Sequence, residues 1–294
     1  MNKNKIVVRI QWWLWNQMFQ YAYAYALSKR NWCKFLLDVS TFDWYKVRHN
    51  QLSDFEKKPI YAEKSDLPYY ERISLFNKNN ILSKFLKAVA WRLNPLDYRE
   101  KSKWYDEDFK NISNGYIIWY FQSDKYFREY KEDIYRLFEF KNETENVVSR
   151  YISDSQIDLK NSVLLHVRRW DFQTDPNVST VPIFYYFEVI KKFFSKNGLV
   201  ICSDDVEWCK KVFKDIENRC FFVEDLWAIE TLCLMSKFKN YIISNSTFSR
   251  WWAYLSREKD KKVIRPDLKF DREKKWVEYC KDHYPEEWIS FKVD

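Results

Sequence analysis

The chain has 294 residues, of which 46% are apolar and 31% charged, and its formal net charge is +8 at pH 7. This balance is typical of a globular protein with one large or two ordinary domains, and it excludes a disordered chain. Apolar runs fall short of the roughly 18 residues that a membrane-spanning helix needs, and the start MNKNKIVVRI has too short an apolar run for a secretory signal. The sequence therefore predicts a cytoplasmic protein.

The first half of the chain opens with alternating strand and helix patterns. Apolar residues at helical spacing follow the first apolar run, and a second strand-like run comes after them. The predicted elements are a strand at 6–10, a helix at 16–30, a strand at 34–39, a helical stretch at 80–93 and a helix at 127–140. The polar stretch 141–160 is the predicted junction between domains at 1–150 and 151–294.

The second half alternates strands and helices more regularly. The predicted strands are 162–167, 199–202, 220–223 and 241–244, and the predicted helices are 182–196, 205–214 and 226–238, with one more after residue 244. Strands and helices that alternate this regularly indicate an α/β fold with parallel strands and helices on both faces of the sheet. In such sheets ligands bind at the carboxyl ends of the strands, so residues that follow a strand are the candidates for function.

Polar motifs follow the predicted strands. They are Gln11–Gln17, His166–Asp171, Ser203–Asp205 and Ser244–Ser249. Two adjacent arginines at a strand end can grip a diphosphate with paired N–H groups, or form surface salt bridges. Ser and Thr at a helix start can bind phosphate or cap the helix, and the Ser-Asp-Asp motif can bind ribose hydroxyls or cap the next helix.

These motifs occur in the same order and at similar spacing as in glycosyltransferase family 11, the bacterial and animal α-1,2-fucosyltransferases, which the chain resembles over residues 6–266. The resemblance rests on NQMFQYA at 16–22, HVRR at 166–169 with Asp171, SDDVEWC at 203–209 and SNSTFS at 244–249. It implies a GT-B-like fold of two Rossmann-like α/β domains facing across a cleft. The first would be the acceptor-side domain and the second would bind GDP-fucose.

The resemblance also implies roles for individual residues. Arg168 and Arg169 would hold the pyrophosphate, and His166 and Asp171 would brace the site. Asp204 would approach the nucleoside. The other predicted donor-binding residues are Asn16 and Gln17 from the first domain and Ser246, Thr247 and Ser249 from the second.

The expected reaction is inverting transfer of L-fucose to the 2-hydroxyl of a terminal galactose or similar sugar, in surface glycan biosynthesis. A general base should take the hydroxyl proton, and Asp171, Asp175 and His49 are the candidates, each with a structural role as the alternative. The sequence has six cysteines without a CxxC pair and three histidines, which argues against a zinc site. We therefore expect no cofactor and no metal, with the arginines stabilising the leaving diphosphate.

The net charge and one partly apolar stretch suggest two further kinds of partner, a membrane surface and nucleic acid. The stretch 81–93 combines basic residues with an apolar face, so it could pack in the ordinary way or lie on the inner face of the membrane. The net charge of +8 also raises a nucleic-acid-binding module as an alternative, although the basic residues are dispersed and match no recognised motif. A second alternative is a catalytically impaired GDP-sugar-binding protein.

The family pattern has glycine where this chain has tryptophan. Tryptophan stands at 12, 13, 15, 170 and 252, and the chain has 15 tryptophans and 2 glycines where average usage predicts roughly 20 glycines. We interpret this as a codon that the source organism reads as glycine but that is written here as tryptophan. Arg250, where the family has tryptophan, would be a second reassigned codon. The alternative is a genuine protein with a degraded nucleotide site.

Overall fold

The computed structural model describes residues 4–43, 47–74, 89, 96–99, 105–169, 180–217, 219–268 and 282–293. The chain divides into two compact units, Met1–Glu139 and Phe140–Asp294. The division thus comes before the predicted boundary at 150, because helix α5 (Asn142–Asp154) packs on helix α9 (Ala228–Met235) of the second unit. Within the described ranges, no helix is long and apolar enough to span a membrane.

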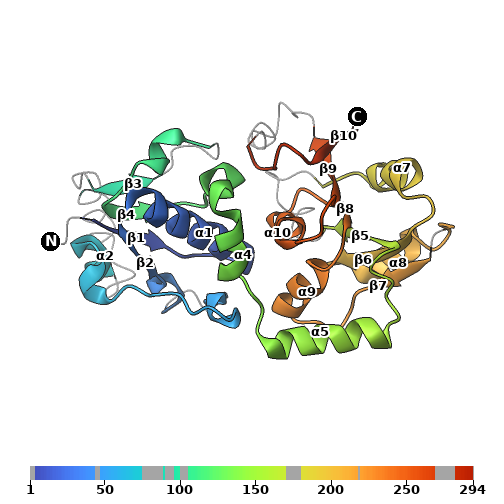
Figure 1. Ribbon diagram of the computed structural model, residues 1–294, viewed down its shortest axis with the longest axis horizontal. Helices are drawn as coiled ribbons and strands as arrows, with labels where there is room; N and C mark the ends of the chain where they lie inside the picture. Colours follow the sequence, from blue (N-terminus) through green and yellow to red (C-terminus); the bar gives the residue numbers. More distant parts are fainter. Residues whose placement is uncertain are drawn as a thin grey trace. The chain divides into compact units, whose positions relative to one another are not determined.

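The first unit is built on a parallel sheet with the strand order β2-β1-β4-β3 (Figure 1). Its strands are β1 (Lys5–Arg9), β2 (Lys34–Asp38), β3 (Asp97–Arg99) and β4 (Gly115–Ile118). Its helices are α1 (Leu14–Asn31), α2 (Tyr69–Ser74) and α4 (Lys131–Leu137). Short 3-10 helices lie at Ser40–Asp43, Leu52–Asp54, Lys64–Asp66, Glu107–Lys110, Asp124–Tyr126 and Arg128–Tyr130. The predicted helix at 80–93 lies, apart from residue 89, outside the described residues.

Helix α1 forms the centre of this unit and is buried over most of its length. Small residues such as Ala22 and Ala24 are fully buried, so the helix lies close to β1 and β2. Its large side chains fill the remaining core, and the ring of Tyr23 stacks on Phe121 with centroids 3.7 Å apart. Aromatic pairs of this kind add to the area-dependent stabilisation, which explains why a helix rich in tyrosine folds inside the unit.

The second unit has a six-stranded parallel sheet with the order β10-β9-β8-β5-β6-β7. Its strands are β5 (Ser162–Val167), β6 (Gly198–Ser203), β7 (Cys220–Phe222), β8 (Asn240–Ile242), β9 (Lys262–Leu268) and β10 (Ile289–Val293). Besides α5 and α9, its helices are α7 (Ile183–Phe193), α8 (Val206–Val212) and α10 (Thr247–Leu255). Counted from β5, this is the 3-2-1-4-5-6 order of a dinucleotide-binding fold. The direction of the connections reverses between β5 and β8, and this point is where such sheets bind ligands.

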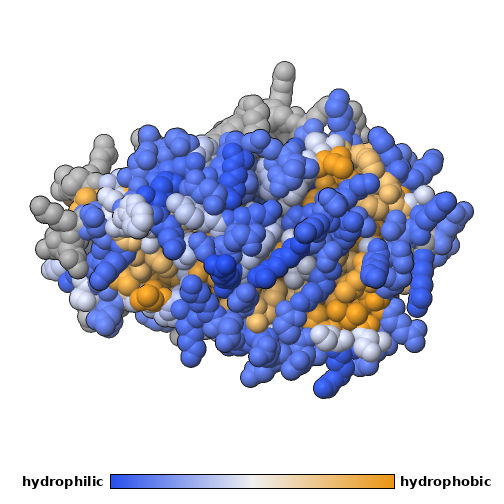
Figure 2. Space-filling view, viewed as in Figure 1, coloured by the Kyte–Doolittle hydropathy of each residue, from blue (hydrophilic) through white to orange (hydrophobic). Residues whose placement is uncertain are grey.

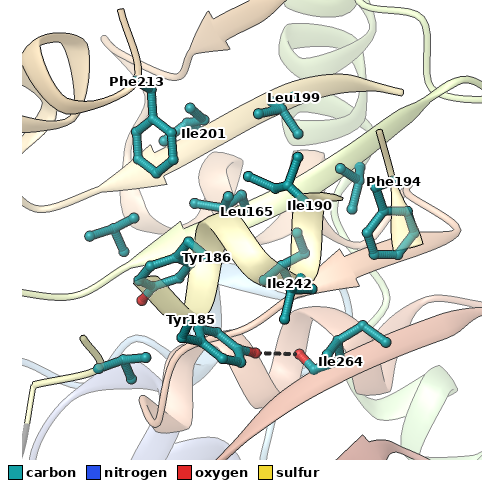
Figure 3. Packing of buried hydrophobic residues seen from close by; sticks show 14 of the residues in the cluster. Leu165, Tyr185, Tyr186, Ile190, Phe194, Leu199, Ile201, Phe213, Ile242 and Ile264 are labelled. Carbon is teal, nitrogen blue, oxygen red and sulfur yellow. Dashed lines mark hydrogen bonds between the residues drawn. The ribbon is translucent and has the colours of Figure 1, made fainter. Parts of the chain in front are cut away.

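Alternate residues of the central strands face two different helix layers. Leu165 and Ile201 point toward α7, where Tyr185 and Ile190 pack on them (Figure 3). The hydroxyl of Tyr185 donates a 3.0 Å hydrogen bond to the backbone oxygen of Ile264 on β9. The neighbouring strand position, 166, contacts α10 instead. Both faces of the sheet are therefore covered, as the continuous apolar run of β5 requires.

The visible surfaces of both units are mostly hydrophilic, with separate patches of apolar side chains (Figure 2). Basic and acidic side chains alternate on α8 and beside it. The Nζ of Lys210 lies 2.9 Å from a carboxylate oxygen of Glu207 and 3.0 Å from one of Glu224. Such interspersed charges are typical of a solvated helix.

Two tryptophans have backbone conformations that favour glycine. Trp12, in the turn after β1, has a φ of +73°, and Trp32, which ends α1, has φ +50° and ψ +43°. A left-handed residue at the end of a helix is usually glycine, because a Cβ there costs about 1–2 kcal/mol. The side chain of Trp32 is 90% exposed, so it gains nothing from packing in return.

We expect Trp32→Gly to stabilise the protein by about 1 kcal/mol, because it removes the steric cost and loses no buried contact. Chemical denaturation of the two proteins measures this difference. Trp227→Gly is the matched control, since Trp227 is 79% exposed but has an ordinary φ of −68°. If both substitutions stabilise the protein, or neither does, the left-handed backbone at position 32 does not carry the expected free-energy cost.

Candidate functional site

The candidate functional residues of the second unit that the structure describes gather near the point where its strand order reverses. His166 lies near the end of β5 and Ser244 follows β8, and the His166 Nδ1 is 2.9 Å from the Ser244 Oγ. The His166 ring is buried and contacts the ring of Trp252 at a centroid distance of 4.4 Å. Burial, and then the nearby Arg168 charge, hold the pKa of His166 well below its ordinary value. His166 is therefore neutral, and it joins the two strands through Ser244.

This state of His166 predicts a pH dependence of stability. The unfolded chain binds a proton near pH 6.5 and the folded protein does not, so the free energy of unfolding decreases as the pH falls below that value. The slope is at most about 1.4 kcal/mol per pH unit, and above the unfolded pKa the contribution is constant. Denaturant unfolding of the wild type and His166→Asn at several pH values between about 5 and 8 measures it. We expect a shallower acid slope in the variant; identical slopes would show that His166 is not held neutral.

The Ser244–Ser249 turn uses most of its hydroxyls internally. The Ser246 Oγ accepts a 3.2 Å bond from the Phe248 N–H and caps α10. The Ser249 Oγ donates to the backbone oxygens of Ser244 and Ser246, at 3.2 and 2.9 Å. Thr247 is half-buried at the first position of α10. Of the three predicted phosphate contacts, Ser246 and Ser249 thus build the turn, and Thr247 is the one whose hydroxyl has no such internal bond among the described residues.

The two arginines after β5 are each paired with a carboxylate after β6. The Arg168 Nε lies 3.3 Å from an Asp204 oxygen, and the Arg169 Nε donates a 3.1 Å bond to Asp205. Asp204 also accepts a 2.9 Å bond from the backbone N–H of Arg169. All four side chains are 15–20% exposed. The structure thus shows Asp204 in contact with both arginines, and the approach to the nucleoside that the resemblance implies stays a prediction.

The guanidinium group of Arg169 is contacted on its face as well as at its Nε edge. The Arg169 Cζ lies 3.7 Å from the centroid of the Trp208 ring on α8. Asp205 caps the same helix by accepting a 3.2 Å bond from the Trp208 N–H. A guanidinium stacked on an indole is held by cation–π attraction. Asp205 and Trp208 were not among the predicted site residues, because their contact with Arg169 joins segments far apart in the sequence.

Buried thiols line the neighbouring strand and helix. Burial raises the pKa of Cys202 to about 12 and that of Cys209 to about 11. Both thiols are therefore protonated near neutral pH and are poor nucleophiles. The cysteines of the described residues are free thiols.

In the first unit, the Asn-Gln motif after β1 holds the turn together. The Gln17 side chain is fully buried, donates to the backbone oxygens of Trp12 and His49 at 2.8 and 2.9 Å, and accepts from the Gln51 N–H at 3.0 Å. Its amide thus has both of its N–H groups and its oxygen bonded within the protein, so Gln17 supports the turn. Its predicted contact with the donor stays a prediction. The Asn16 oxygen accepts a 2.9 Å bond from Gln122.

The candidates for the general base are only partly covered by the described residues. His49 is exposed, and its backbone oxygen accepts a hydrogen bond from the Gln17 side chain. Asp171 and Asp175 lie outside the described residues, as does Trp170. Their catalytic role therefore stays a prediction.

A second charged cluster joins the strands of the first unit. The Arg9 Nε donates a 2.8 Å bond to the Tyr116 hydroxyl, and its Nη2 lies 2.6 Å from Glu71. Tyr116 in turn donates to Asp38. Burial raises the pKa of Tyr116 well above its ordinary value. The cluster connects β1, β2, β4 and α2, and it pairs the Arg9 guanidinium with buried carboxylates, as buried charges require.

An α/β sheet of this order with an arginine pair at its switch point is typical of proteins that bind phosphorylated, nucleotide-like ligands. The model of Glycosyl transferase family 11 matches residues 5–292. The chain belongs to that family and is a glycosyltransferase.

Two Escherichia coli proteins are similar to the chain along most of its length. The O-antigen biosynthesis glycosyltransferase WbnK is 29% identical over 86% of this chain and 91% of its own length. An alpha-1,2-colitosyltransferase is also 29% identical, over 97% of this chain and 98% of its own. Among solved structures, the fucosyltransferase NodZ from Bradyrhizobium superposes with a TM-score of 0.54 and 14% identity, covering 91% of this chain and 96% of its own. NodZ has also been solved after soaking with GDP-fucose. This likeness confirms the predicted GT-B-like α/β fold.

Proposed function

We propose that the protein transfers L-fucose from GDP-fucose to the 2-hydroxyl of a terminal galactose or similar sugar, as a galactoside α-1,2-fucosyltransferase of surface glycan biosynthesis. The observation that carries the proposal is the arginine pair at the switch point of the second sheet, held by two carboxylates. The similarity to an alpha-1,2-colitosyltransferase supports the linkage, and the fold shared with NodZ is compatible with a GDP-linked donor.

The proposed reaction is a single displacement with inversion at the anomeric carbon. The acceptor 2-oxygen forms a bond to the fucose C1 as the C1–O bond to the diphosphate breaks, and the electron pair of that bond stays on the diphosphate oxygen. The proton of the acceptor hydroxyl passes to a base, for which Asp171, Asp175 and His49 remain the candidates. Arg168 and Arg169 stabilise the charge that develops on the leaving GDP, in the place that a metal ion takes in other transferases.

His166 is not proposed as the base. Its pKa is held well below the ordinary value by burial, so the imidazole has little affinity for the hydroxyl proton. Its contact with Ser244 instead keeps the β8 turn beside the arginines.

A donor panel tests the proposal. The protein is incubated with galactose-ended acceptors and with GDP-fucose, nucleotide-activated colitose or a UDP-hexose, and sugar transfer is followed by mass spectrometry. We expect transfer from GDP-fucose. Transfer from the colitose donor alone would reassign the donor sugar. Binding of GDP without transfer would favour the impaired binding protein, and salt-sensitive retention on heparin without a response to GDP would favour the nucleic-acid alternative.

A further inference from the structure

The contacts around Arg169 restrain both its edge and its face. Asp205 fixes the Nε edge, and the Trp208 indole lies against the guanidinium plane. Arg168 is fixed at its Nε edge by Asp204, which also accepts from the Arg169 backbone N–H. The Nε edge of each guanidinium group is thus bound to a carboxylate. Because the guanidinium group is planar and rigid, fixing this edge also fixes the direction of its terminal N–H groups.

We propose that Asp204, Asp205 and Trp208 are positioning residues that aim the two arginines at the second phosphate of the nucleotide. This inference rests on the proposed function, which supplies the diphosphate. Two carboxylates beside two guanidinium groups leave no net charge in the cluster, so ligand recognition here depends on the direction of the N–H groups more than on bulk positive charge. A diphosphate offers paired oxygens that match such fixed forks.

A comparison of GDP with GMP separates this role from a merely structural one. Both nucleotides share the guanosine and the first phosphate, and only GDP has the second phosphate. Loosening the arginines therefore weakens GDP binding and leaves GMP binding nearly unchanged. General damage to the fold weakens both.

The chain offers variants suited to this comparison. Asp205→Asn keeps the cap of α8, because asparagine is as good an N-cap as aspartate, but it removes the charged bond to Arg169. Trp208→Leu removes the stacking surface, and Trp208→Phe restores an aromatic face. Glu207→Gln is the matched control, since Glu207 lies on the same helix and pairs with Lys210.

The experiment is isothermal titration of the full chain and each variant with GDP and with GMP. We expect Asp205→Asn and Trp208→Leu to raise the Kd for GDP about tenfold, the loss of roughly one charged hydrogen bond, with the Kd for GMP changed less than about twofold. Trp208→Phe should recover most of the GDP affinity, and Glu207→Gln should match the wild type. Unchanged GDP binding, or equal losses for both nucleotides, would overturn the inference. A wild type that binds neither nucleotide would overturn the proposed donor itself.

Discussion

Replacing Arg169 by lysine is expected to lower kcat/KM for GDP-fucose by about 100- to 1,000-fold, the range found when one donor to a developing anion is removed. Lysine keeps the charge but has a single ammonium group in place of the planar guanidinium. It therefore cannot bind Asp205 through one edge and a phosphate through the other. It also loses the flat face that lies 3.7 Å from the Trp208 ring centroid. Arg168→Lys should behave in the same way, because Arg168 has the equivalent bond to Asp204.

The control is Arg136→Lys, an exposed arginine on α4 that pairs with Asp133. Steady-state transfer assays with all three variants, together with thermal unfolding, measure the effect. We expect the control to keep wild-type activity and all the variants to keep their melting temperatures within a few degrees. An Arg169→Lys enzyme with wild-type kcat/KM would show that the pair does not stabilise the leaving group.

Restoring glycine at positions 12, 13, 15 and 252 is expected to raise transfer activity on the order of 100-fold. This is the gain expected when groups displaced from their productive geometry return to it. Trp12 has a φ of +73°, and the Trp252 indole fills the space beside His166 at the switch point. The Trp252 indole N–H is buried without a hydrogen-bond partner among the described residues, which is costly. Trp119 has a buried indole N–H of the same kind.

The neighbouring Trp251 is the control for position 252. It is equally buried, but the family pattern has tryptophan there, so Trp251→Gly should destabilise the protein by about 3–5 kcal/mol. Peptide mass spectrometry of the protein from its source organism checks the residues directly. Glycine at 12 and 252 with tryptophan at 251 would support the reassigned codon. Tryptophan at all three positions would contradict it and favour the degraded nucleotide site.

The sequence predicted the strands of the second unit well because β5 and β6 are continuous apolar runs with polar residues at their ends. It did not predict β9 and β10. For β10 the reason is that the strand is largely exposed and lacks a clear apolar pattern. The predicted helix at 127–140 begins as a 3-10 turn and is regular only over α4, where Ile134, Tyr135 and Leu137 are buried.

Within the site, the motifs were predicted but the partners of their side chains were not. The arginine pair and the helix cap at Ser246 could be predicted from local sequence. Gln17 was expected to contact the donor, and its bonds to backbone groups as far away as Gln51 were not predicted. Asp204 was expected near the nucleoside, and its pairing with Arg168 was not predicted. Contacts of this kind depend on which strand ends become neighbours, and one sequence read along its length does not contain that information.

The linkage and configuration of the transferred sugar test the central claim most directly. The glycine-restored chain is incubated with GDP-fucose and a galactose-ended acceptor in EDTA, and the product is analysed by NMR. We expect an α-1,2-linked fucose, formed with inversion from the β-linked donor and in the same yield with or without the chelator. A different linkage, or no product until a divalent metal is added, would contradict this expectation.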